Sequence, residues 1–229
     1  MNVGIITFHR ALNYGAVLQT YALYQSIKKL AVAEDDVFVL DHVGEKMKKQ
    51  YALFCLSRQM GFNIRQAVIL PAKILKKIRF NSFLKRNLKL KTVADSGDRM
   101  ITGSDQVWNL DIMYGDEAYF LDFVKNPRCK NSYAASFGTE KISDKYVEAT
   151  TRLLSDFNKI SVREETGRQI IKDIVNRDVP VVLDPTMLLG WDEWKEVAGK
   201  RKLKKEYILI YTLAGNRSEE HTSELQSLT

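Results

Sequence analysis

The chain has 229 residues and a formal net charge of +7, with 45% hydrophobic and 28% charged residues. These proportions are ordinary for a globular protein and exclude a disordered chain, and no apolar run reaches the roughly 18 residues that a membrane-spanning helix needs. Two isolated cysteines without metal-ligand spacing, together with the absence of a leader-like start, predict a cytoplasmic protein without disulfides, structural metal or signal peptide.

Short apolar runs alternate with helix-length amphipathic segments along the chain. Strands are predicted at residues 3–8, 37–41, 99–103, 131–136, 159–162, 180–183 and 207–213. Helices are predicted at 15–31, within 58–90, and at 143–157, 164–176 and 191–199. This alternation predicts an α/β fold with a Rossmann-like, mostly parallel sheet that is flanked by helices.

The turn between the first predicted strand and the first helix is a candidate binding segment. Asn13, Gly15 and Ala16 stand where backbone N–H groups at a helix N-terminus can face an anion or a hydroxyl, although a plain tight turn explains them nearly as well. His9, at the strand end, has the chemistry to exchange protons near neutral pH, and a structural role is the alternative. The turn lacks G-x-G-x-x-G, which argues against a nicotinamide-dependent oxidoreductase.

The positive charge is concentrated in one segment. Residues 44–91 contain thirteen Lys or Arg and one acid, Glu45, which gives a segment charge of +12. Apolar residues recur there near helical spacing, so the segment is predicted to be a basic helical insertion with the character of a helix that lies on an anionic membrane surface. A solvated helical face packed on its own domain is the alternative. Nucleic-acid binding is not expected, because no recognised binding motif accompanies the charge.

Residues 103–109, Gly-Ser-Asp-Gln-Val-Trp-Asn, directly follow a predicted strand and are the densest polar stretch of the chain. Ligands bind at the carboxyl ends of strands in open α/β sheets. The alternative is a capped turn in which Ser104 or Asp105 starts a helix and Trp108 anchors the core.

Three further strings follow in order: residues 132–138 (Ser-Tyr-Ala-Ala-Ser-Phe-Gly), residues 161–164 (Ser-Val-Arg-Glu) and residues 182–186 (Val-Leu-Asp-Pro-Thr). Taken together and in this order, the motifs from residue 1 to about 213 resemble the polysaccharide pyruvyl transferase family. The resemblance implies two Rossmann-like domains that face each other across a cleft, as in GT-B enzymes. It also implies transfer of the enolpyruvyl group of phosphoenolpyruvate to two hydroxyls of one sugar, with no cofactor besides this donor.

The same resemblance assigns roles to individual residues. Asp105 is the expected base or sugar-hydroxyl ligand, and His9 is a second catalytic candidate. Arg163 is the expected clamp for the carboxylate or phosphate of the donor, with an ordinary ion pair to Glu164 or Glu165 as the alternative. The remaining expected substrate-binding residues are Asn13, Gly15, Ala16, Gly103, Ser104, Gln106, Trp108, Asn109, Ser136 and Gly138.

Residues 1–205 are expected to form the acceptor-side domain and residues 206–216 to begin a second one. Residues 217–227 resemble the translation of a sequencing adapter, so residues 217–229 are interpreted as a non-native tail, and the chain as given is expected to be inactive. The expected partner is a glycan or lipid-linked sugar at the inner face of the cytoplasmic membrane. Two alternatives are a GT-B glycosyltransferase that uses a nucleotide sugar and a basic membrane-surface module without catalysis.

Overall fold

The structure is a computed structural model that describes residues 2–44, 48, 60–94, 98–200 and 205–208; for residues 60–67 it describes the backbone only. The chain divides into two compact units, residues 1–191 and residues 192–229. The first unit holds the sheet and all of the predicted site residues. In the second unit, the described part contains most of helix α6 (Trp191–Val197).

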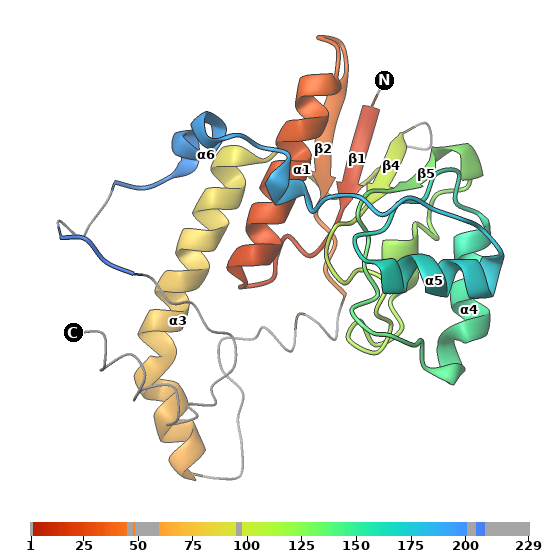
Figure 1. The fold of residues 1–229 in the computed structure, drawn as a ribbon. Helices are drawn as coiled ribbons and strands as arrows, with labels where there is room; N and C mark the ends of the chain where they lie inside the picture. Colours follow the sequence, from red (N-terminus) through yellow and green to blue (C-terminus); the bar gives the residue numbers. More distant parts are fainter. Residues whose placement is uncertain (1, 45–47, 49–59, 95–97, 201–204, 209–229) are drawn as a thin grey trace. The chain divides into compact units, whose positions relative to one another are not determined.

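A five-stranded parallel sheet forms the centre of the first unit, which confirms the predicted α/β fold (Figure 1). Its strand order is β3-β2-β1-β4-β5. The strands are β1 (Asn2–Ile6), β2 (Asp36–Leu40), β3 (Leu90–Lys91), β4 (Arg99–Thr102) and β5 (Lys130–Ser132). From β1 the chain first builds outward through β2 to β3 and then returns to place β4 on the other side of β1. Such a reversal of strand order is where open α/β sheets bind ligands.

The helices lie close to their predicted positions. They are α1 (Tyr14–Leu30), α3 (Met60–Asn87), α4 (Asp144–Ser155) and α5 (Glu165–Val175), with short 3-10 turns η1 (Glu117–Phe120), η2 (Pro127–Cys129) and η3 (Pro185–Met187). Helix α1 packs against β2, α3 and η3, whereas α4 packs against α5 and η1.

Two predicted strands, at 159–162 and 180–183, are present only as isolated parallel bridges. Serine hydroxyls account for the first. Ser132 and Ser161 each donate from Oγ to the other's carbonyl at 3.0 Å, and the Ser161 N–H donates to the Ser132 Oγ at 3.0 Å. These side chains take backbone partners that a strand ladder would use. The two-residue strand β3 was not predicted, and residues 209–213 of the last predicted strand lie outside the described residues.

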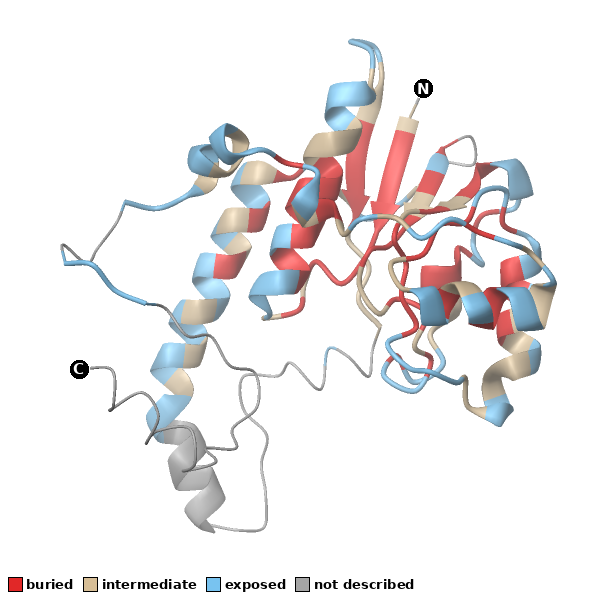
Figure 2. Ribbon diagram, viewed as in Figure 1, coloured by how far each residue is buried: buried red, intermediate tan, exposed pale blue. Residues whose placement is uncertain are grey.

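The core lies around β1, β2 and β4 (Figure 2). Strands β1 and β2 are buried along four of their five residues, as expected for parallel strands that are covered on both faces. The loops that follow the carboxyl ends of these strands therefore begin in the packed core, and the buried strands fix the position of their backbone.

Candidate functional site

The two most distinctive strings of the sequence lie side by side after β4 and β5. The Ser136 N–H donates to the Asp105 carbonyl at 3.1 Å, and the Trp108 N–H donates to the Ser136 carbonyl at 3.1 Å. This backbone pairing joins the loop at 103–109 to the loop at 132–138. The structure thus brings together two segments that the sequence had proposed separately.

Gly103 is required by its surroundings. Its φ is +125°, and a Cβ built there would lie 2.1 Å from the Tyr133 carbonyl oxygen. A side chain is excluded both by the backbone conformation and by this close approach. Gly103 therefore lets the β4 loop run against the β5 loop.

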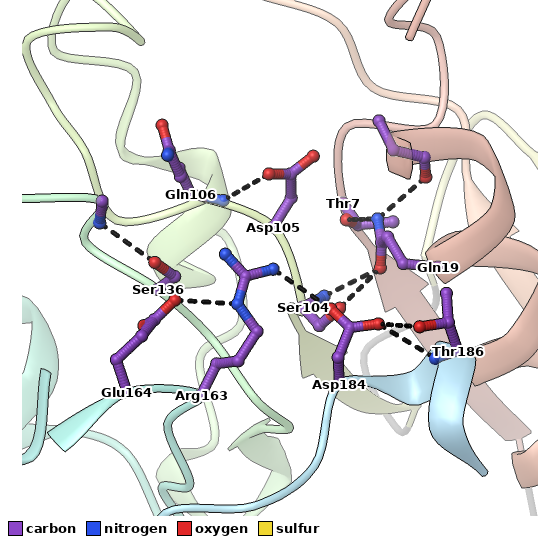
Figure 3. A network of polar contacts seen from close by, with 12 residues as sticks. Thr7, Gln19, Ser104, Asp105, Gln106, Ser136, Arg163, Glu164, Asp184 and Thr186 are labelled. Atoms are coloured by element: carbon purple, nitrogen blue, oxygen red, sulfur yellow. Dashed lines mark hydrogen bonds and ion pairs between the residues drawn. The ribbon is translucent and has the colours of Figure 1, made fainter. Parts of the chain in front are cut away.

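Ser104 anchors the loop instead of facing a ligand. It is fully buried, and both its N–H and its hydroxyl donate to Oε1 of Gln19, at 3.1 and 2.9 Å. The Gln19 amide nitrogen in turn donates to Thr7 Oγ1 at 2.9 Å and to the Ala16 carbonyl at 3.0 Å. A single buried glutamine of α1 thereby ties the loop after β4 to the end of β1 (Figure 3).

Asp105 stands at the centre of the candidate site. Its Oδ1 accepts from the Gln106 N–H at 2.8 Å. Burial raises the pKa of the Asp105 carboxyl, and the negative charges of Asp184 and Glu164 act in the same direction, although the Gln106 N–H and the Arg163 charge oppose them. A carboxyl with a raised pKa holds its proton to higher pH than an exposed one, which suits proton transfer to or from a hydroxyl.

Arg163 is held between two carboxylates. Its Nε donates to Glu164 Oε1 at 2.8 Å and its Nη1 to Asp184 Oδ2 at 3.1 Å. Asp184 also accepts from the N–H and the hydroxyl of Thr186, so it caps η3 as well as orienting the guanidinium (Figure 3). The charges of Arg163, Asp184 and Glu164 also act on the Asp105 carboxyl, so three carboxyl groups and one guanidinium form one electrostatic cluster. This excess of negative charge disfavours an anion and favours a ligand that offers hydroxyl groups.

The other predicted residues of these two loops shape the backbone. Gly138 has φ +62°, and a Cβ there would meet the Gln106 side chain at 2.3 Å. The buried Ser136 hydroxyl accepts from the Gly138 N–H at 3.0 Å, and Asn109 Oδ1 accepts from the Ile112 N–H at 3.1 Å. Gln106 is thus the half-buried amide whose position the second loop restricts.

Trp108 lies in the core. The indole is 2% exposed and packs against Phe120, Phe137 and Phe157, with ring centroids 5.3 to 5.8 Å away. This placement supports the core-anchor alternative over a sugar contact. The second loop also carries an aromatic ring that is not fully buried, that of Tyr133, whose pKa is raised first by burial and then by the charge of Asp184.

The N-terminus of α1 is capped by its own side chain. Asn13 Oδ1 accepts from the Gly15 N–H at 2.8 Å and from the Ala16 N–H at 3.4 Å. The N–H groups that were expected to face an anion therefore already have an acceptor. This geometry supports the tight-turn alternative for Asn13, Gly15 and Ala16.

His9 is fully buried and engaged at both ring nitrogens. Nδ1 lies 3.1 Å from the Thr7 carbonyl and Nε2 lies 2.9 Å from Asp41 Oδ1. Arg10 donates to both oxygens of the same carboxylate. Hydrogen bonds from His9 and then from Arg10 hold the pKa of Asp41 well below its ordinary value. The structural role is therefore the better supported one for His9.

The sequence did not single out a second His–Asp pair. His42, two residues after the end of β2, places Nε2 at 2.9 Å from Asp116 Oδ2, and its ring packs edge-on against Tyr119. Both side chains line a cavity of about 470 Å³ together with Tyr114 and Gly115. A search for polar residues at strand ends would find His42, but its partner lies 74 positions along the chain.

The described residues contain no group of three or more His, Cys, Asp or Glu side chains arranged to hold a metal ion. Within that same part of the chain, no helix is both long and apolar enough to cross a membrane.

Comparison with known proteins identifies the chain by its family. No curated protein and no solved structure matches it. The model of one family, described as polysaccharide pyruvyl transferase, matches residues 13–223, which is most of the chain and includes both loops of the candidate site. This match favours an enzyme over a binding module without catalysis and pyruvyl transfer over sugar transfer from a nucleotide. The chain belongs to the polysaccharide pyruvyl transferase family.

Proposed function

We propose that this chain supplies the acceptor side of a transferase that joins the enolpyruvyl group of phosphoenolpyruvate to two hydroxyls of one sugar. In that reaction, C3 of the donor gains a proton and C2 forms a bond to each sugar oxygen. The bond from C2 to the phosphate oxygen breaks. Of the two hydroxyl protons, one is transferred to C3 and the other to the released phosphate, so the product is a ketal.

One observation supports the acceptor role above the others: Arg163 is paired with both Glu164 and Asp184, and the charges of all three residues act on the Asp105 carboxyl. Carboxylates accept hydrogen bonds from hydroxyls, whereas they repel the phosphate and carboxylate of the donor. The donor's anionic groups are therefore assigned to the facing wall of the cleft, and Arg163 is reassigned from anion clamp to a group that orients the carboxylates.

Asp105 is the proposed general base for the first sugar hydroxyl. Its burial and its like-charged neighbours raise the pKa of the carboxyl, which brings that pKa closer to the pH at which the enzyme works. Gln106 and Tyr133 are the proposed neighbouring contacts of the sugar, because both are half-buried and belong to the paired loops.

Ligand-observed NMR tests this assignment on the chain as it stands. We expect saturation transfer to methyl hexopyranosides and no competing transfer to phosphoenolpyruvate. Asp105→Asn should weaken the sugar signals, whereas the matched change Asp122→Asn, at an exposed position, should leave them unchanged. Binding of phosphoenolpyruvate with no binding of any sugar would reverse the assignment of acceptor and donor walls.

Turnover is the second readout, and it requires a chain that carries both walls of the cleft, since proximity of donor and acceptor is itself a large part of catalysis. The signals are phosphate release and a new ketal methyl resonance. In such a chain, Asp105→Asn should lower turnover by about 10² to 10⁴-fold, the usual contribution of a general base. A lower melting temperature with unchanged turnover would assign Asp105 to the turn alone.

A further inference from the structure

Helix α3 has an apolar face that its own fold does not bury. On its inner face, Phe80 and Leu84 are 7% and 1% exposed. Leu75 is nine positions before Leu84, which is two and a half helical turns, so the two side chains point in opposite directions. Leu75 is 48% exposed and Ile78 is 58% exposed. A helix that packs on one side of a domain needs only one apolar face, so the outer one requires another explanation.

We define the outer strip of α3 as its exposed aliphatic residues Val68, Ile74, Leu75 and Ile78. The strip continues into a groove of about 440 Å³ between α3 and α1, to which Leu75 also belongs. Tyr14 and Leu18 form the α1 wall of that groove and are 54% and 36% exposed. The strip and the groove together form an apolar surface built from two helices.

Cations border this apolar surface, and no acid is among the described residues that line the groove. Residues 60–91 contain no Asp or Glu. Lys76 and Arg79 line the groove, and Lys76 Nζ lies 5.3 Å from the centre of the Tyr14 ring and 5.5 Å from that of Phe80. Lys85 borders Ile78 of the strip. Within the described part of the chain, Lys76, Arg79 and Lys85 form no ion pair with a carboxylate, whereas Lys89 and Lys91, beyond the helix, pair with Asp36.

We propose that the outer strip and the α1–α3 groove form a docking surface for a membrane that contains anionic lipid. The cations complement the negative headgroups, while the aliphatic side chains enter the boundary between headgroups and acyl chains. A nucleic acid would match the charge alone and would leave the aliphatic strip exposed to water. The membrane accounts for both properties, and the inference does not depend on the reaction that the enzyme catalyses.

Vesicle co-sedimentation of the full 229-residue chain tests the proposal. Vesicles of phosphatidylcholine with 30% phosphatidylserine (roughly −30 mV or more at the surface) should bind the protein, and vesicles of phosphatidylcholine alone should bind it far less. The triple variant Lys76→Glu, Arg79→Glu, Lys85→Glu should lower partitioning about a hundredfold, because each basic side chain near the surface contributes about 1 kcal/mol and 1.4 kcal/mol is a factor of ten. Raising the salt from about 0.1 M to 1 M should release the wild type, since the Debye length falls from about 10 Å to 3 Å.

A matched control separates location from net charge. Lys125→Glu, Lys159→Glu, Lys172→Glu makes the same change in charge at exposed positions outside α3 and should keep partitioning within about threefold of wild type. The uncharged variant Ile74→Ser, Ile78→Ser tests the aliphatic strip. It should weaken binding to anionic vesicles while leaving the helical circular dichroism signal unchanged, because both side chains are exposed.

Three results would overturn the proposal. The first is equal pelleting of the two triple variants. The second is no pelleting of wild type with anionic vesicles at low salt. The third is unchanged pelleting of the serine variant, which would reduce the interaction to charge alone. Tight, salt-sensitive binding to RNA or DNA without vesicle binding would assign the same cations to a nucleic acid instead.

Discussion

Gln19 is the residue on which the geometry of the candidate site depends most directly. It is 3% exposed, and its Oε1 is the acceptor for two buried donors of Ser104, the N–H and the hydroxyl. Gln19→Ala removes that acceptor. Each buried donor that is left unpaired costs about 1–3 kcal/mol. The Ser104 hydroxyl can rotate toward another oxygen while the N–H cannot, so we expect a loss of about 2–4 kcal/mol.

Urea unfolding measures this loss. The unfolding is followed by tryptophan fluorescence, which reports on the buried Trp108, and by far-ultraviolet circular dichroism. If the two transitions coincide, a two-state treatment is valid. The matched control is Gln169→Ala on α5. The exposed Gln169 side chain donates only to Asp173 one turn away, so its loss should cost about 0.5 kcal/mol or less.

A double-mutant cycle with Ser104→Ala isolates the contact. Because both changes remove the same hydroxyl hydrogen bond, the double variant should be less destabilised than the sum of the single ones by about 1 kcal/mol. Additive effects, or a Gln19→Ala variant as stable as the Gln169→Ala control, would refute the view that this glutamine holds the loop.

Three further predictions follow from charge and backbone conformation. Because the pKa of the Asp105 carboxyl is raised in the folded state, this carboxyl stabilises the fold below its ordinary pKa of about 4, and the stabilisation is lost as the pH rises. The melting temperature of Asp105→Asn should therefore rise relative to that of wild type between pH 4 and pH 8. The pH dependence of Asp41 has the opposite sign, because its pKa is lowered in the folded state and the carboxylate stabilises the fold above about pH 4. Asp41→Asn should therefore lower the melting temperature at pH 7, and its difference from wild type should shrink as the pH falls below 4. The control Asp122→Asn should show neither trend. Gly103→Ala should lower the free energy of unfolding by roughly 3 kcal/mol or more, or prevent folding. Gly199→Ala, with no atom within 4 Å of the added Cβ, should leave the free energy of unfolding unchanged. Equal expression and equal melting temperatures of the two variants would contradict the close packing of Gly103 against the β5 loop.

The sequence predicts where the site lies better than it predicts which atoms face it. A polar run straight after an apolar strand is a local signal, and the structure places 103–109 and 132–138 together at the carboxyl ends of β4 and β5. Whether a given side chain points inward is a tertiary property. Ser104 turns toward α1 because Gln19, 85 positions earlier, offers it an acceptor.

The residues that the sequence missed depend on partners from distant segments. Asp41 becomes notable only when Arg10 and His9 are seen beside it, 31 and 32 positions away. Asp184 caps the turn η3, and its second role depends on Arg163 reaching it from 21 positions away. No pattern of residue types within a short window distinguishes these acids from ordinary capping residues.

The hydrogen bonds between Ser132 and Ser161, which stand in place of a regular ladder beside β5, affect how easily this part of the site moves. The loop that carries Asp105 is attached to the continuous ladder of the sheet through the Gly103 N–H, which donates to the Ile6 carbonyl. It is attached to α1 through the Ser104 N–H, which donates to Gln19. The segments that carry Arg163 and Asp184 are joined to their neighbours by isolated bridges at Val162 and by separate backbone hydrogen bonds, such as that from the Arg163 N–H to the Ala135 carbonyl at 3.2 Å, and not by a continuous ladder. Segments with few ladder hydrogen bonds open at lower free energy than the strands beside them. We therefore expect the backbone around Asp105 to keep its position, whereas the segments around Arg163 and Asp184 shift to accommodate ligands of different width.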